Sequence, residues 1–215
     1  MGMTILYWGL GLTASLLGAW AGYTAISEGG LDQPAYTVTE QMTVGEVRQY
    51  APFIIAQTQP PVAGDPGLSQ GFRTLAGYIF GGNTPNEKLA MTAPVLQQNA
   101  PGESLPMTAP VLNSSTQMMM AFVMPSDRQM DDLPVPNSGD VSLQEIDLGR
   151  VAALQFSGRG KQAIFAKEEA RLRAELKARG LQPAAPALYA QYNSPFAFPP
   201  MRRNEVLIPL TPGAQ

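Results

Sequence analysis

The order of predicted strands and helices constrains the fold most, because the same order occurs twice along the chain. Each half has a strand pair, one amphipathic helix and then further short strands. The helices are predicted over 69–80 and 161–180, and the strands over 36–39, 45–58, 88–96, 105–112, 116–125, 141–148, 150–158, 187–192 and 204–210. We therefore predict an α+β fold, a pseudo-twofold distorted antiparallel β-barrel of about eight strands flanked by two α-helices.

Each predicted helix has an apolar face at helical spacing. Phe72, Leu75 and Ile79 share one side of the first helix, which we expect to begin with Ser69 as N-cap and to end at Gly81. The expected apolar stripe of the second helix consists of Ile164, Ala170, Leu172 and Leu176. Both helices are therefore expected to pack one face on the sheet.

The short strands of the first half carry repeated and methionine-rich sequences. The hexapeptide MTAPVL occurs at 91–96 and again at 107–112. Its prolines cannot donate to a ladder, so each is expected at an edge or a bulge. The next strand contains Met118, Met119, Met120 and Met124. Thioethers can ligate soft metals, but methionine is also a common core filler, and we interpret this cluster as core.

The N-terminal segment is uncharged over residues 1–27. Ile5–Ile26 is 22 residues long, and as a helix it would measure about 33 Å, enough to cross a hydrocarbon core of about 30 Å. Trp8, Trp20 and Tyr23 lie toward its two ends, where interfacial aromatic residues are common. We therefore predict one N-terminal transmembrane helix, with a buried core helix as the alternative.

This segment sets the predicted domain organisation and location. We assign residues 1–27 to a membrane anchor or signal segment, 28–35 to a linker and 36–211 to the folded domain. The sequence Ala19-Trp20-Ala21 has the form of a signal-peptidase site, so secretion after cleavage is the alternative to an uncleaved anchor. Acidic residues follow the segment and the first basic residue is Arg48, so we expect the domain outside the cytoplasm.

The chain contains no cysteine and no histidine. This composition excludes disulfides, thiolate nucleophiles, Ser-His-Asp triads and histidine zinc sites. We therefore expect no enzymatic activity, no catalytic residue and no metal site built from these side chains. The net charge is −3 without a basic stripe, so we also expect no nucleic-acid partner.

Six segments between residues 36 and 210 form a series in a fixed order. They are GEVRQY (45–50), FRTLAGYIFGGN (72–83), EKLAMTAPV (87–95), FVMPS (122–126), QFSG (155–158) and YNSPF…RRNEV (192–206). In order and spacing this series resembles the SOUL heme-binding protein family. The resemblance implies a pseudo-twofold barrel and non-covalent binding of heme or another tetrapyrrole in an open hydrophobic groove. The architecture also resembles that of effector-binding domains.

One position departs from the family pattern. The resemblance implies that a histidine in the motif E-[IV]-R-H-Y is the axial heme ligand in one subgroup. Here the motif reads Glu46-Val47-Arg48-Gln49-Tyr50, so Gln49 occupies the ligand position. An amide oxygen is a poor iron ligand. Histidine-ligated heme is therefore excluded, while apolar binding, or an axial methionine or tyrosine such as Tyr50, stays open.

Residue chemistry adds candidate contacts to those of the motif. Propionates need basic partners, and the faces of a tetrapyrrole need apolar walls. Arg73 and Lys88 are the basic candidates, although a solvated surface position is the simpler explanation for each. Two roles are equally compatible with Phe72, Leu75 and Tyr78, lining a groove and packing in the core. The candidate ligand-binding residues are Gln49, Tyr50, Phe72, Arg73, Leu75, Tyr78 and Lys88.

The sequence therefore favours a binding function. The first hypothesis is a carrier or buffer of heme or a related tetrapyrrole, held at a membrane through the N-terminal helix. The alternatives are a general binder of small hydrophobic ligands and an envelope interaction protein without a small ligand.

Overall fold

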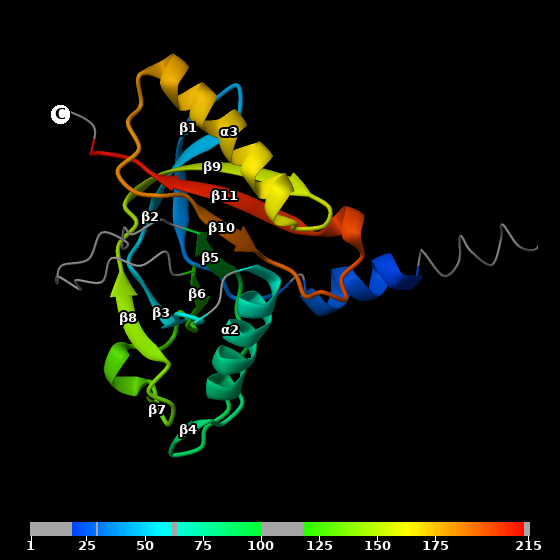
Figure 1. The fold of residues 1–215 in the computed structure, drawn as a ribbon, viewed down its shortest axis with the longest axis vertical. Helices are drawn as coiled ribbons and strands as arrows, with labels where there is room; N and C mark the ends of the chain where they lie inside the picture. Colours follow the sequence, from blue (N-terminus) through cyan, green and yellow to red (C-terminus); the bar gives the residue numbers. More distant parts are fainter. Residues whose placement is uncertain (1–18, 29, 62–63, 100–117, 213–215) are drawn as a thin grey trace, which may run out of the picture.

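The computed structural model describes residues 19–28, 30–61, 64–99 and 118–212. Their main feature is a nine-stranded antiparallel sheet with the strand order β1-β2-β9-β11-β10-β5-β6-β3-β8. A small second sheet pairs β4 with β7. Figure 1 shows the large sheet curled, with α3 lying along β9 and β11 and α2 beside β6.

The elements have the following bounds. The strands are β1 Tyr36–Gln41, β2 Glu46–Tyr50, β3 Phe53–Thr58, β4 Asn83–Thr84, β5 Val95–Asn99, β6 Met118–Val123, β7 Val135–Pro136, β8 Ser142–Ile146, β9 Arg150–Ser157, β10 Leu188–Gln191 and β11 Arg203–Pro209. The helices are α2 Gly64–Ile79 and α3 Gln162–Arg179, the short 3-10 helices are η1 Met130–Asp132 and η2 Pro199–Met201, and a further N-terminal helix covers 19–28.

The strand order shows how the two halves of the chain combine. Strand β2 of the first half pairs with β9 of the second, and β8 of the second half pairs with β3 of the first. Strands β5 and β10 pair at the centre, so the order is symmetric about them except for the extra strand β1. The predicted α+β fold is confirmed. The predicted distorted barrel of about eight strands is confirmed only in part, because the described strands form a nine-stranded curled sheet, a half-barrel with β1 and β8 at its edges.

Three apolar cores hold the sheet and helices together. The first fills the concave side of the sheet, where Tyr50 from β2 and Ile146 from β8 belong to one cluster. The second lies under α3 and the third under α2. Because each helix covers one half of the sheet, the strip over β5 and β10 lies between the helices.

Helix α3 buries a different stripe from the one predicted. Leu172 and Leu176 are buried as expected, but Ile164 is only half-buried and Ala170 is exposed. The buried aromatic residue is Phe165, whose ring stacks on Tyr189 with 4.5 Å between centroids. The one-residue shift follows from the direction in which the helix crosses the sheet, which helical spacing alone leaves open.

Helix α2 begins five residues before the predicted N-cap. Its first residue is Gly64, so Ser69 lies inside the helix. Pro66 lies in the first turn, where backbone N–H groups have no acceptor within the helix, so the missing N–H of proline costs no hydrogen bond. Leu75 and Ile79 are buried as predicted, whereas Phe72 remains 37% exposed.

The prediction of a strand over 88–96 is largely wrong. Strand β5 begins only after Pro94, which has no N–H to donate. The second MTAPVL copy, at 107–112, lies outside the described residues. In β6 the methionines are buried, with Met119 in the concave core and Met120 in the core under α2, so their interpretation as core residues is confirmed.

The predicted transmembrane segment lies mostly outside the described residues. Within the ranges that the structure describes, no helix is both long and apolar enough to cross a membrane. The last part of the predicted span, 19–26, belongs to the N-terminal helix, which packs on the loop over 193–201. Figure 1 shows this helix in blue beside η2.

Candidate ligand groove

The E-V-R-Q-Y motif forms β2, and strand alternation divides its side chains between two faces. Arg48 and Tyr50 are buried, and Tyr50 belongs to the concave core. Gln49 points to the opposite face and is exposed. The position of the family's histidine ligand therefore lies on the outside of the half-barrel.

Arg48 forms a buried ion pair with Glu205 of β11. Arg48 Nη1 donates to Glu205 Oε2 at 2.8 Å, and Nη2 donates to Oε1 at 3.0 Å. The Tyr192 hydroxyl donates to Oε2 at 2.7 Å, and Arg203 Nε donates to Oε1 at 2.9 Å. The Glu205 side chain is fully inaccessible and that of Arg48 is 3% exposed. Every oxygen of Glu205 is thus satisfied inside the protein.

The electrostatics of this cluster favour a fixed ion pair. Burial by itself raises the pKa of Glu205, but the hydrogen bonds and charges of Arg48 and Arg203 outweigh it and lower the pKa below its ordinary value. Burial, followed by the charge of Glu205, raises the pKa of Tyr192. The Arg48–Glu205 pair is closed to solvent and internally paired, which indicates a structural role.

A groove of about 810 Å³ lies over the two central strands, between α2, the start of α3 and the N-terminal helix. Gln97 of β5 and Gln191 of β10, from the two central strands, line it, and α2 and the N-terminal helix contribute its walls. This volume is within the range of about 300–1,000 Å³ typical of small-molecule sites. Its apolar lining consists of Leu31, Leu68, Phe72, Met91, Val95 and Met120.

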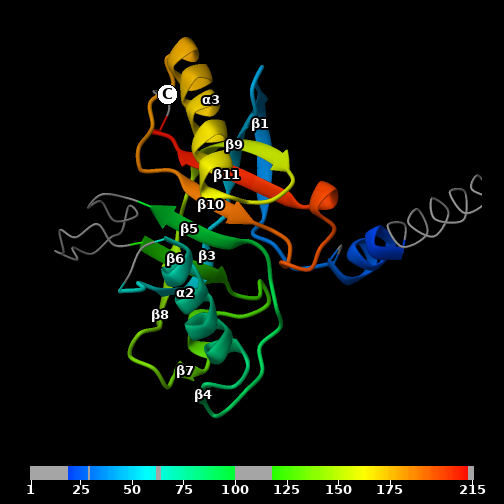
Figure 2. The ribbon, with the colours of Figure 1, turned by 45° about the vertical axis from the view of Figure 1, so that its right-hand side comes forward.

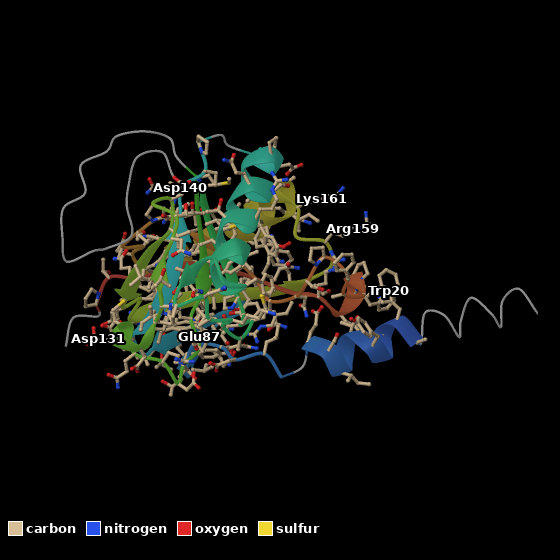
Figure 3. All side chains as sticks on the ribbon, turned by 90° about the horizontal axis from the view of Figure 1, so that it is seen from below. Trp20, Glu87, Asp131, Asp140, Arg159 and Lys161 are labelled. Carbon is tan, nitrogen blue, oxygen red and sulfur yellow. The ribbon has the colours of Figure 1, made fainter. Side chains whose placement is uncertain are left out.

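Basic side chains surround this apolar lining. Arg73 of α2, Arg159 of the loop before α3, and Lys161, the N-cap residue of α3, all line the groove. Among the described residues, none of the three has an ion pair or a side-chain hydrogen bond, and Figure 3 shows Arg159 and Lys161 on the side of the molecule that carries Trp20. Arg202 also lines the groove, but it donates to the carbonyl oxygens of Ala197 (2.9 Å) and Pro195 (2.6 Å).

One carboxylate faces these cations. Glu28 lines the groove, but it accepts hydrogen bonds from Asn193 Nδ2 at 2.8 Å and from the Ser194 hydroxyl at 2.5 Å. It forms no ion pair with the basic residues of the rim within the described part of the chain. The groove therefore offers uncompensated positive charge beside apolar surface, the combination that suits an amphipathic anion.

The structure brings only two of the seven predicted site residues into the groove, Phe72 and Arg73. Leu75 and Tyr78 belong to the core under α2, and the Tyr78 hydroxyl donates to the Pro134 carbonyl oxygen at 2.9 Å. Lys88 is exposed and lies outside the groove lining. Gln49 and Tyr50 also lie outside it, so Tyr50 is not placed as an axial ligand of a molecule in the groove.

Sequence reasoning missed most of the groove. The missed residues come mainly from the RGK that follows QFSG, from YNSPF and the RR further along, from MTAPVL and β6, and from the N-terminal helix. The motifs QFSG, MTAPVL and YNSPF…RRNEV were visible in the sequence, but they were not connected to α2, because no local pattern shows which loops meet. Missed lining residues with a chemical role are Tyr23, Met91, Arg159, Lys161 and Arg202.

Comparison with known proteins identifies the family. The family model described as SOUL heme-binding protein matches residues 31–209, most of the chain. The protein belongs to the SOUL heme-binding protein family. No curated protein matches this SOUL chain significantly.

Solved structures support the fold of this SOUL chain. It is similar to the EcmrR C-terminal domain at 9% identity, with a TM-score of 0.56 over 82% of this chain and 98% of that domain. It is also similar to an uncharacterized conserved protein from Listeria innocua at 11% identity, with a TM-score of 0.51 over 84% and 93% of the two chains. At such identities the likeness concerns the fold alone.

The groove of the SOUL chain provides few groups for a metal. Across the described ranges there is no group of three or more acidic, cysteine or histidine residues that could hold a metal ion. The lining holds thioether and phenol donors in Met91, Met120, Tyr23 and Tyr192. Met91 and Tyr23 are 43% and 63% exposed, whereas Met120 is packed in the core under α2 and the Tyr192 hydroxyl is bonded to Glu205. The apolar lining and cationic rim thus fit a tetrapyrrole, and the donors near the groove for its iron are weak, exposed or already engaged.

Proposed function

We propose that the groove binds heme or a related tetrapyrrole reversibly, without covalent attachment and without histidine ligation. The observation that carries this proposal is the apolar groove bordered by Arg73, Arg159 and Lys161, none of which has a side-chain partner in the described residues. A tetrapyrrole with propionates presents matching chemistry, a wide apolar ring and an anionic edge. Membership of a heme-binding family supports the same ligand class.

The roles of the groove residues follow from their chemistry. Phe72 and Met91 would contact the ring faces, and Arg73 with Lys161 would hold the carboxylates by charge-assisted hydrogen bonds. Bound heme would supply a redox-active iron, which the chain lacks. With only weak iron donors nearby, the protein acts as a carrier or buffer that releases its ligand.

We also propose that residues 1–27 tether the domain to a membrane, with the domain outside the cytoplasm. The uncharged sequence of that segment supports the tether, and the acidic residues that follow it support the orientation.

The binding proposal is tested by titrating hemin into the full chain in lipid nanodiscs, with empty nanodiscs as background. We expect a Soret shift that saturates near one equivalent. The variant Arg73→Glu/Lys161→Glu should weaken binding at least tenfold, because two favourable charge contacts become repulsive. Lys88→Glu is the matched control, since Lys88 is exposed and outside the groove, and should bind like the parent. Equal binding by all three proteins would exclude this groove as the site.

A second candidate function is general binding of apolar small molecules. The lack of a strong iron ligand in the groove favours it. Metal-free protoporphyrin separates the two in part, because binding as tight as that of hemin shows that iron contributes nothing. Displacement of either porphyrin by unrelated apolar carboxylic acids would favour the general binder.

A further inference from the structure

The N-terminal helix is fixed to the domain by one side. The Thr24 residue is 3% exposed, and its hydroxyl accepts a hydrogen bond from the Phe198 backbone N–H at 2.9 Å. The Trp20 indole N–H donates to the Phe196 carbonyl oxygen at 2.7 Å, and the rings of Trp20 and Phe198 are 5.1 Å apart. The helix therefore has a defined orientation on the loop over 193–201.

The remaining surface of this helix is apolar and faces outward. Tyr23 is 63% exposed and Ile26 is 88% exposed, and in the adjoining loop Phe196 is 78% exposed. No charged residue occurs before Glu28. The apolar face, as we call this surface, consists of Trp20, Tyr23, Ile26, Phe196 and Met201.

Exposed apolar side chains are concentrated at this end of the domain. Of the eleven large hydrophobic residues exposed in the described part of the chain, five form the apolar face and two more, Phe72 and Met91, line the neighbouring groove. A surface helix in water normally carries charged residues on its outer side. A concentration of exposed apolar side chains of this kind marks a contact with a membrane or another protein.

The sequence before the helix indicates what covers the face. Residues 1–18 lead directly into it and carry no charge, so the surface that holds this segment must lie next to the apolar face. Tryptophan and tyrosine are enriched at the level of lipid headgroups. We infer that the apolar face docks on the bilayer that holds the N-terminal segment, with the rings of Trp20, Tyr23 and Phe196 at the interface.

This docking rests on the proposed tether but not on the proposed ligand. It has a consequence for the groove, because Tyr23 belongs both to the apolar face and to the groove lining. The docked domain therefore holds the groove beside the lipid surface. An apolar ligand can then exchange between groove and bilayer without crossing bulk water.

The chain has no cysteine, so single-cysteine labelling tests the docking directly. The full chain carrying Phe196→Cys is labelled with an environment-sensitive fluorophore and reconstituted into phospholipid vesicles. Val135→Cys is the matched control, because Val135 is 67% exposed and lies in β7, at the end of the molecule away from the N-terminal helix in Figure 2. Ile26→Cys is a second reporter on the apolar face.

We expect the labels at 196 and 26 to show blue-shifted emission and several-fold weaker quenching by aqueous iodide than the label at 135. Nitroxide lipids should quench the first two labels only. Equal iodide quenching at 196 and 135 would overturn the inference, as would failure of the chain to float with vesicles. The inference would also be overturned if the labels lost their protection from iodide at a lower ratio of protein to lipid. Such a loss would show that a second copy of the chain, and not the bilayer, covers the face. Hemin titration of the same samples reports separately on the ligand.

Discussion

The buried ion pair between Arg48 and Glu205 allows a stability prediction with a defined size. Arg48→Met removes two of the hydrogen bonds to a carboxylate that is fully inaccessible. Breaking one partner of a buried pair costs about 3–5 kcal/mol. Arg203 Nε still donates to Glu205 at 2.9 Å, so we expect the lower end, about 3 kcal/mol.

The assay is urea unfolding of the full chain in a non-ionic detergent, followed by near-UV circular dichroism. The control is Arg128→Met, which breaks the pair of Arg128 with Glu87, where both side chains are about one-third exposed (36% and 34%). It should cost about 0.5 kcal/mol or less. The double variant Arg48→Met/Glu205→Leu should be more stable than either single variant, because neither Arg48 nor Glu205 is then left as a buried charge without its partner.

The same pair predicts how stability depends on pH. The pKa of Glu205 is lowered in the folded protein, so its contribution is present above the ordinary glutamate pKa and is lost as the pH falls through the folded value. Arg48→Met should therefore flatten the acid side of the stability profile. The reasoning is refuted if Arg48→Met costs no more than Arg128→Met, or if the single effects simply add in the double variant.

Three further substitutions concern other elements. Burial raises the pKa of Tyr78 from 10.0 to about 12, so stability should be full below pH 10 and fall as the pH rises toward 12, and Tyr78→Phe should reduce this alkaline loss in urea titrations. At Gly45, φ is +80° and a Cβ would lie 2.3 Å from the Ala153 carbonyl oxygen, so Gly45→Ala should lower the thermal midpoint. A Cβ on Gly77 meets nothing within 4 Å, so Gly77→Ala in α2 should stabilise by up to about 1 kcal/mol. Destabilisation by both alanines would contradict the steric argument.

Local pattern was sufficient for much of the fold. Helical spacing predicted α2 and α3, and the repeated order of strands and helices predicted a two-half α+β sheet. The errors occurred where a local pattern has two solutions. Ile164 and Phe165 both fit a helical stripe, and only the crossing of α3 over β9 and β11 buries Phe165. Pro94 is compatible with an edge strand that includes it or with a strand that starts after it. In the structure, β5 starts after Pro94.

The site was less predictable than the fold, because its parts are distant in sequence. Arg73 and Phe72 were predicted correctly because both lie in a motif segment that also forms a helix, so few side chains were candidates. Arg159 and Lys161 were missed, since only the pairing of β5 with β10 brings the start of α3 toward α2.

The sequence by itself determined the family, the exclusion of histidine and cysteine chemistry, and an uncharged segment at the N-terminus. These are properties of residue identity and order, which folding does not change. Only the tertiary structure decided that Gln49 faces outward, that Arg48 finds its charge partner 157 positions away, and that the groove lies over the two central strands. Strand alternation tells which side chains share a face, but long-range packing decides which face is covered and which side chains meet across it.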